Sequence, residues 1–151
     1  MNKGVFGTIT NIAVNTVFIF ILFGVLLEGT GAGHTLLKFA FILTRRTRGG
    51  PAQAAILASP MFGTMSGSVV ANIVGTGTFT IPMIKKRGFT PTFAGGIEAT
   101  ASSGGQIMPP IMGAAALVMA DLTGINYLSI ALAALIPALL YYFSLFSSVT
   151  M

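Results

Sequence analysis

The sequence contains no cysteine and very little charge. Its 151 residues include three acidic side chains and one histidine, and only 7% of the residues are charged. Without cysteine the chain has no disulfide framework and no thiolate chemistry. Three acids and one histidine provide neither a transition-metal site nor a general base placed beside a nucleophilic serine. The sequence therefore predicts a protein that is not an enzyme and that carries no cofactor.

The scarcity of charge indicates a membrane protein. In soluble domains about a quarter of the residues are charged. In this chain the fraction is 7%, and 54% of the residues are hydrophobic. The apolar residues come in long runs, and strands of a membrane β-barrel would instead alternate apolar and polar residues. The predicted fold is therefore an all-α integral membrane protein with several passes through the lipid bilayer.

The net charge of +5 does not indicate nucleic acid as a partner, because the basic residues are clustered. Six of the eight lie in two short groups beside apolar segments: Arg45, Arg46 and Arg48, and Lys85, Lys86 and Arg87. Basic residues beside membrane segments mark the cytoplasmic side. Both groups are therefore expected on that side.

The N-terminal part of the chain predicts a spanning helix and a surface helix. Residues 5–27 are long and apolar enough to cross a bilayer. Asn11 and Asn15 share one face of that helix, where they are expected to hydrogen-bond to a neighbouring helix. Residues 34–44 are too few to span, so we expect a helix lying in the membrane interface. His34 is an interfacial polar group there or, as an alternative, part of a proton relay.

Residues 51–84 predict a re-entrant helical hairpin. Two apolar halves flank an uncharged centre, Ser66-Gly67-Ser68, and both ends of the segment carry a basic group. Both ends therefore lie on the cytoplasmic side. The segment is shorter than the roughly 40 residues that two complete crossings require. A hairpin with its tip inside the membrane fits best, and two short tilted spans are the alternative.

Residues 91–121 predict a discontinuous helix. Two apolar halves, 91–101 and 111–121, flank the stretch Ser102-Ser103-Gly104-Gly105-Gln106-Ile107-Met108-Pro109-Pro110. Glycine frees the backbone, and proline removes amide donors and disfavours helix just before it. Asp121 begins a solvated turn, after which residues 127–149 form the last spanning helix. Pro137 is expected to kink that helix, and its tyrosines suit interfaces or helix contacts.

The two interruptions place oxygen atoms at membrane depth, which is the chemistry that Na⁺ prefers. Unwound carbonyls and helix C-termini suit Na⁺, and helix N-termini such as those after Ser68 and Pro110 suit anions. The alternative is that the glycines only allow helices to pack closely. The candidate ligands are the hydroxyl groups of Ser66, Ser68, Ser102 and Ser103 and the carbonyl groups of Gly67, Gly104 and Gly105.

Other polar residues are weaker candidates. Asn72 lies one helical turn after Ser68 and either faces the same cavity or makes an interhelical hydrogen bond. Gln106 and Pro109 lie in the break, and together with Asn72 they are assigned to the substrate path. Glu98 is the one acid inside an apolar span, where charges are costly and usually functional. Its alternative is an interfacial ion pair with the group at residues 85–87.

Three stretches of the sequence resemble the large membrane subunit of TRAP (tripartite ATP-independent periplasmic) transporters. They are FGTMSGSVVAN at 62–72, TGTFTIPMIKKRGF at 76–89 and FAGGIEATASSGGQIMPPIMGAAA at 93–116. The closest similarity is to the fused permease type that works with TAXI-class binding proteins. The resemblance implies an elevator-type carrier, in which a transport domain slides against a scaffold.

The resemblance also implies roles for individual residues. Ser66, Gly67 and Ser68 match the hairpin tip that helps to hold one Na⁺. Ser103, Gly104 and Gly105 match the unwound segment that completes this site. The family couples Na⁺ entry to uptake of an organic anion, here a small carboxylate, which a periplasmic binding protein delivers. The expected location is the bacterial inner membrane.

By this resemblance the chain divides into three parts. Residues 1–48 form a scaffold-type spanning helix and an arm helix, 49–125 belong to the transport domain, and 126–151 form a spanning helix. The second, inverted half of such permeases is absent, so we expect the first half of an inverted repeat that needs the remaining permease segments. The alternatives are a structural membrane module or non-functional fragment that binds no ion and, last, a channel subunit.

Overall fold

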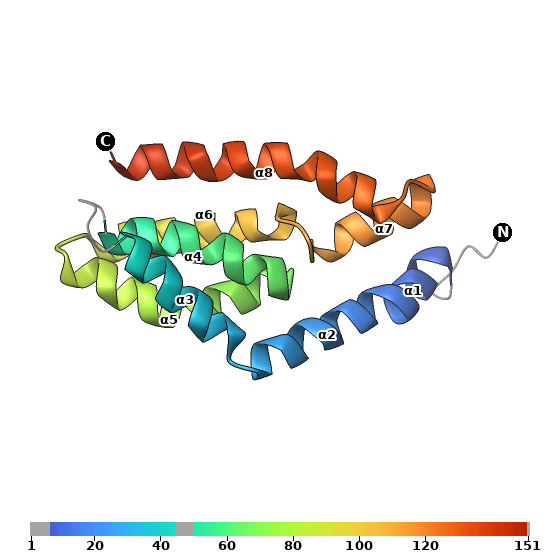
Figure 1. The fold of residues 1–151 in the computed structure, drawn as a ribbon, viewed down its shortest axis with the longest axis horizontal. Coiled ribbons are helices and arrows are strands. Elements are labelled where there is room, and N and C mark those ends of the chain that lie inside the picture. The colour runs from blue at the N-terminus through green and yellow to red at the C-terminus, as the bar shows by residue number, and fades with distance from the viewer. Residues whose placement is uncertain (1–6, 45–49, 151) are drawn as a thin grey trace.

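The computed structural model describes residues 7–44 and 50–150, and these form helices joined by short turns (Figure 1). The described residues contain no strand, which confirms the all-α prediction. In chain order the elements are α1 (Thr8–Ile12), the π-helix η1 (Ala13–Val17), α2 (Phe18–Gly29), α3 (Ala32–Thr44), α4 (Gly50–Ser66), α5 (Val69–Lys86), α6 (Pro91–Gly104), the 3₁₀ turn η2 (Gly105–Ile107), α7 (Ala114–Thr123) and α8 (Tyr127–Thr150).

Among the described residues, α8 is the one helix that is long and apolar enough to cross a membrane. It has 24 residues and continues through Pro137. Its outer face carries large apolar side chains, among them Leu132 and Phe143, whose exposed fractions are 65% and 73%. Such a face suits contact with lipid, because lipid tails are as apolar as these side chains.

The N-terminal segment is helical from Thr8 to Gly29, with one π-helical interruption at η1. The predicted spanning helix began at residue 5, and residues 5 and 6 lie outside the described part. Asn15 donates a hydrogen bond to Asn11. Within the described residues the two side chains therefore bond to each other, and their hydrogen bond to a neighbouring helix stays a prediction.

Helices α4 and α5 form a hairpin that turns at Gly67. Gly67 has a φ of +58°, a left-handed conformation that glycine adopts without steric cost. Ser68 then caps α5, because its hydroxyl oxygen accepts a hydrogen bond from the amide of Ala71 at 3.4 Å. Small residues around a glycine thus end one helix and begin the next. The predicted hairpin and the residues of its tip are present, while its re-entrant position in a membrane remains a prediction.

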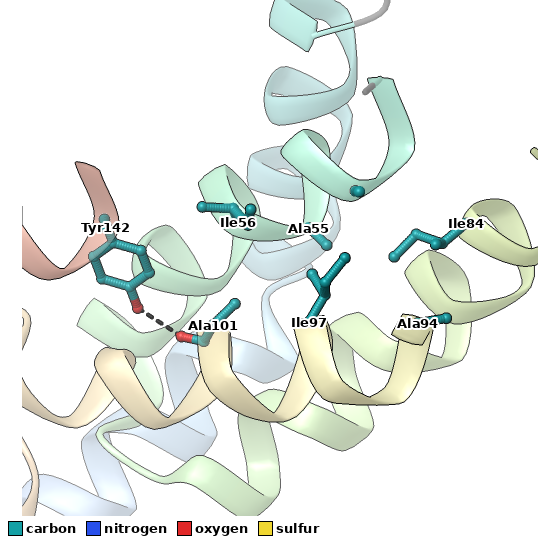
Figure 2. Close-up of a cluster of buried hydrophobic side chains, with 8 residues drawn as sticks. Ala55, Ile56, Ile84, Ala94, Ile97, Ala101 and Tyr142 are labelled. Atoms are coloured by element: carbon teal, nitrogen blue, oxygen red, sulfur yellow. Dashed lines mark hydrogen bonds between the residues drawn. The ribbon is translucent and has the colours of Figure 1, made fainter. Parts of the chain in front are cut away.

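Helix α6 packs against both arms of the hairpin through small side chains. Ala55 on α4 and Ala94 and Ala101 on α6 are completely buried, and they lie beside Ile56, Ile84 and Ile97 (Figure 2). Small residues at such contacts let helix backbones approach closely. The hairpin and α6 therefore form one packed unit.

Helix α8 is attached to α6 by two tyrosines. The hydroxyl of Tyr142 donates to the carbonyl of Ala101 at 2.8 Å (Figure 2). The hydroxyl of Tyr141 donates to the carbonyl of Thr100 at 2.7 Å. These bonds confirm helix contact as a role of the tyrosines, which the sequence left open beside an interfacial role.

The helix that begins at Pro91 is interrupted between η2 and α7, as the sequence predicted. Its first half stays helical to Gly104 and then tightens into η2, so it is longer than the predicted 91–101. Met108 is extended, with φ −86° and ψ 119°, because a residue that precedes proline is restricted to such conformations. The two prolines, more than the two glycines, therefore end the first half. The second half begins at Ala114.

Helix α3 packs along α4. Ala40 of α3 and Ala58 of α4 are buried against each other, flanked by Phe41 and Leu57. The arm helix of the sequence analysis therefore contacts the hairpin directly. Its predicted place in a membrane interface stays a prediction.

Candidate functional site

The tip of the hairpin touches the break in the discontinuous helix (Figure 1). The amide of Ile111 donates a hydrogen bond to the carbonyl of Thr64 at 3.2 Å. A Cβ atom added to Gly67 would lie 2.8 Å from the carbonyl oxygen of Met112 and 3.3 Å from that of Ile111. The two interruptions therefore meet main chain to main chain, and only glycine fits at this point of the tip.

A second close contact lies one helical turn below the tip. A Cβ atom on Gly63 would be 2.5 Å from the Cα of Gly105. Beside it, the buried amide of Asn72 donates to the carbonyl of Ser59 at 2.9 Å. Gly63 and Gly105 are thus required for close packing of α4 against the end of α6, which is the alternative that the sequence left open for its glycines.

A cavity of about 260 Å³ opens beside the tip. Its polar groups come from the tip and the break, and its apolar walls come from η1, α2 and α7. The lining residues are Val17, Ile21, Ser66, Gly67, Ser68, Gln106, Ile111, Met112, Ala114 and Leu117. The cavity therefore brings the hydroxyl groups of the two tip serines to the same space as the main chain of residues 111 and 112.

Four helix ends converge around this cavity. Helix α4 ends at Ser66, α5 begins after Ser68, η2 ends at Ile107 and α7 begins at Ala114. The C-terminal ends of helices carry partial negative charge and the N-terminal ends carry partial positive charge. The arrangement thus provides carbonyl oxygens for a cation and amide groups for an anion within one small region.

The structure brings together only part of the predicted site. Ser66, Gly67, Ser68 and Gln106 all line the cavity. Ser103 is exposed, and its hydroxyl donates to the carbonyl of Ala99 at 2.8 Å.

The other predicted residues are not among those that line the cavity. A Cβ atom on Gly104 would lie 2.5 Å from the ring of Tyr141, so Gly104 packs against α8. Gly105 lies below the tip, against Gly63. Asn72 is buried behind the tip in its hydrogen bond to α4, and Pro109 is not among the lining residues.

Glu98 is completely buried, in a pocket made of hydroxyl groups. One carboxylate oxygen accepts from the hydroxyls of Thr76 and Ser102, and the other accepts from Thr80 at 2.5 Å. The alternative of an ion pair with residues 85–87 is therefore wrong, because hydroxyl donors occupy both oxygens. Ser102, whose hydroxyl is directed at Glu98, is left out of the candidate ion site.

Tyr127 has a role that the sequence analysis did not assign. Its hydroxyl donates to the carbonyl of Pro110 at 2.7 Å and accepts from the amide of Met112 at 3.1 Å. Pro110 and Met112 lie in the break, where backbone groups have no helical partners. The sequence held one signal for this role, because a single short helix separates Tyr127 from the break. Since α7 and α8 pack against each other, the beginning of α8 lies beside the break.

Asp121 lies in the last turn of α7, and not in the turn that follows it as the sequence predicted. It is exposed and lines a polar pocket of about 200 Å³ together with Asn11, Ile12, Asn15 and Thr16. The acid is thus accessible to water from this pocket, in agreement with a solvated side chain.

Comparison with known proteins places these features in a family. The family described as the DctM component of the tripartite ATP-independent periplasmic transporter matches residues 1–151. The uncharacterized protein y4mL of Sinorhizobium fredii is 32% identical over 121 residues, which cover 80% of this chain and 28% of that protein. No solved structure matches the chain.

Two further relatives carry functional names. The C4-dicarboxylate TRAP transporter large permease protein DctM of Pseudomonas aeruginosa is 31% identical over 121 residues, 80% of this chain and 28% of that protein. The sialic acid TRAP transporter large permease protein SiaM of Vibrio cholerae is 32% identical over 104 residues, 69% of this chain and 24% of that protein. The chain spans less than a third of the length of these relatives. It belongs to the DctM family of TRAP transporter large permeases, which are membrane transport proteins of the bacterial inner membrane.

Proposed function

We propose that this chain forms part of a permease that couples Na⁺ entry to uptake of an organic anion across the bacterial inner membrane. A periplasmic binding protein, of the TAXI class by sequence resemblance, delivers the anion. The observation that carries the proposal is the contact between the hairpin tip and the break, with a cavity at which four helix ends converge. Interrupted helices of this kind bind ions and substrates in secondary transporters.

The proposed Na⁺ site lies on the tip side of the cavity. Ser66, Gly67 and Ser68 line the cavity together with Ile111 and Met112, whose carbonyl oxygens lie close to Gly67. The proposed ligands are the hydroxyls of the two serines and the carbonyls of Gly67, Ile111 and Met112. All of these ligands are oxygen atoms, as a hard cation requires. Residues 103–105, which the family resemblance adds to the site, do not line the cavity, so in this proposal they position the break that follows them and supply no ligand.

The proposed anion lies near the N-terminal ends of α5 and α7. The amide groups of these ends attract negative charge, and the side chain of Gln106 can donate hydrogen bonds from the cavity wall. Two of the relatives are named for C4-dicarboxylates and for sialic acid. Both are carboxylates, and a third relative is named for isethionate, a sulfonate. The three names support an organic anion as the substrate, for which we propose a small carboxylate.

The hairpin is proposed to be re-entrant. Its tip contacts Met112, and α7 then continues for a further 10 residues, which is about 15 Å of helix. Helix α8 packs against both α6 and α7 (Figure 1). If α8 crosses the bilayer, the tip stops well short of the far surface. This geometry supports a re-entrant hairpin over two complete spans.

Transport assays on the complete permease and its binding protein test the Na⁺ site. Ser66→Ala and Ser68→Ala each remove one ligand, and we expect each to raise the Na⁺ concentration for half-maximal uptake about tenfold, the equivalent of about 1.4 kcal/mol. Ser103→Ala and Ser148→Ala, whose hydroxyls bond to their own helices, serve as matched controls and should leave it unchanged. Unaltered Na⁺ dependence in both tip variants would show that the ion lies elsewhere.

A structural module that binds no ion is the second candidate. The close contact of Gly63 with Gly105 favours it, since helix packing alone explains both glycines. Single cysteines at Thr64 and Val69, which flank the tip and leave the proposed ligands intact, separate the two functions. In a transporter their rate of maleimide labelling changes when Na⁺ or substrate is added, and in a packing module it stays constant.

A further inference from the structure

The carboxyl group of Glu98 has no part in the proposed Na⁺ site. It is completely buried between α5 and α6, and its side chain also packs against Gly77, where an added Cβ would lie 3.1 Å from its Cγ. Charges in the interior of membrane proteins are costly and serve a function by default. The arrangement of hydrogen bonds around it indicates which function this is.

Two of the three hydroxyl groups around Glu98 have a second acceptor within reach. The Thr76 hydroxyl lies 2.7 Å from the carbonyl of Asn72, and the Thr80 hydroxyl lies 3.0 Å from the carbonyl of Thr76. A hydroxyl group has one proton to donate and can accept as well. Each threonine therefore donates either to Glu98 or to its own helix, and in the second case its oxygen is free to accept.

This pocket satisfies the carboxyl group in both of its protonation states. When Glu98 is ionised, both threonines and Ser102 donate to it. When a proton from solution binds the oxygen beside Thr76, that O–H donates to the Thr76 hydroxyl, whose own proton turns to the carbonyl of Asn72. No buried donor or acceptor loses its partner in either state, so neither state carries the cost of an unpaired polar group.

We propose that Glu98 is a proton-binding site of the hairpin and α6 unit, and that uptake depends on pH through this residue. A short chain of hydrogen bonds connects Glu98 to the hairpin tip. Asn72 lies one turn from Thr76, its side-chain oxygen is 3.4 Å from the Thr76 hydroxyl, and its amide group holds Ser59 beside the contact of Gly63 with Gly105. Proton binding thus changes the hydrogen bonds of the helix that carries Ser68.

No charged side chain competes for this role among the described residues packed around Glu98. Helix α4 carries no ionisable group, and α5 carries Lys85 and Lys86 in its last turn, both exposed and beyond Thr80. Helix α8 presents Tyr141 and Tyr142 to α6, and their hydroxyls donate to backbone carbonyls of α6. Glu98 is also the sole acidic residue of α6.

Infrared difference spectroscopy tests proton binding without any transport assay. The chain is reconstituted in lipid nanodiscs and titrated across the range in which buried carboxyl groups ionise, up to about pH 9. We expect a carbonyl band of a protonated carboxyl group that disappears on deprotonation and is missing in Glu98→Gln. Asp121→Asn, which changes an exposed acid, should retain the band. Helical content measured by circular dichroism shows that each variant is folded.

Glu98→Asp provides a second variant if Glu98→Gln does not fold, and it should keep the band with a shifted midpoint. A titration of the unaltered chain with no such band, or a band that survives in folded Glu98→Gln, overturns the proposal. The dependence of uptake on pH rests in addition on the proposed transport function. At saturating Na⁺, Glu98→Gln should flatten the pH profile of uptake, while Ser148→Ala, which removes an exposed hydroxyl bonded to its own helix, leaves the profile unchanged. A pH profile of uptake that is unaltered in Glu98→Gln overturns the proposed pH dependence of uptake, but not proton binding by Glu98.

Discussion

Gly63 and Gly105 set how closely the hairpin approaches the end of α6. A Cβ atom on Gly63 would lie 2.5 Å from a backbone carbon of Gly105, which has no flexible side chain to move aside. Gly63→Ala should therefore force the two helices apart, at a cost of about 1–3 kcal/mol. Denaturant unfolding in detergent, followed by circular dichroism, measures this loss.

Gly96→Ala is the matched control for this substitution. Gly96 lies in α6, is exposed, and has no atom within 4 Å of an added Cβ. Alanine should be neutral there or stabilise the helix by up to about 1 kcal/mol. Equal effects of the two substitutions would contradict the close contact and leave helix propensity as the sole cause.

For single residues, the sequence predicted which residue types lie at the interruptions better than it predicted where each side chain points. Ser66, Gly67 and Ser68 line the cavity because a turn places all of its residues at one point. Ser102 and Ser103 are neighbours inside a helix, where successive side chains point in different directions. One binds Glu98 and the other faces outward, so their roles depend on the rotation of α6 against α5. That rotation is set by tertiary packing, which the local pattern of residues does not contain.

The two broken elements were predictable because glycine and proline act locally. Gly67 ends α4 because it adopts a left-handed conformation, and the pair Pro109-Pro110 ends the first half of the broken helix because it holds Met108 extended. The boundaries were less predictable. Gly104 and Gly105 stay in helical conformation, since one packs on Tyr141 and the other on Gly63. Contacts between elements thus extended the first half of the discontinuous helix beyond its predicted end.

Tyr127 stabilises the break, and its substitution tests that role. Tyr127→Phe removes the acceptor of the Met112 amide and the donor to Pro110, and Met112 is only 7% exposed. A buried amide left without a partner costs about 1–3 kcal/mol. We expect a loss of that size in the free energy of unfolding, with faster hydrogen exchange at the Met112 amide.

Tyr141→Phe is the control for Tyr127→Phe. It removes a donor to the carbonyl of Thr100, which belongs to the regular part of α6. The expected loss is about 0.5–1.5 kcal/mol, the net value of an ordinary hydrogen bond. Hydrogen exchange at Met112 should not change in this variant. If hydrogen exchange at Met112 is also faster in Tyr141→Phe, Tyr127 does not specifically stabilise the break.

Many large apolar side chains of the described residues are exposed. Large apolar side chains on α2 and α8, such as Phe23, Val25, Ile136 and Phe143, are each more than half exposed. Contiguous apolar patches mark surfaces that meet lipid or other protein. The residues of this chain that align with the matched relatives cover only 28% of their length. These apolar faces therefore suit contact with lipid or with further permease segments. Which face meets lipid and which meets protein depends on how the chain lies in the membrane.

Labelling of single cysteines determines that orientation, and the absence of native cysteine makes the background clean. The proposed topology places Thr92 on the cytoplasmic side, near the basic group at residues 85–87, and Thr123 on the opposite side, with the hairpin tip between them. Thr123→Cys should react with a membrane-impermeant maleimide in intact spheroplasts, whereas Thr92→Cys should react only after lysis.

Labelling at Val70, which is exposed and lies next to the tip, distinguishes a re-entrant hairpin from two complete spans. Val70→Cys should stay unlabelled in intact cells if α7 extends beyond it by about 15 Å, and labelling as fast as that of Thr123→Cys would establish two complete spans instead.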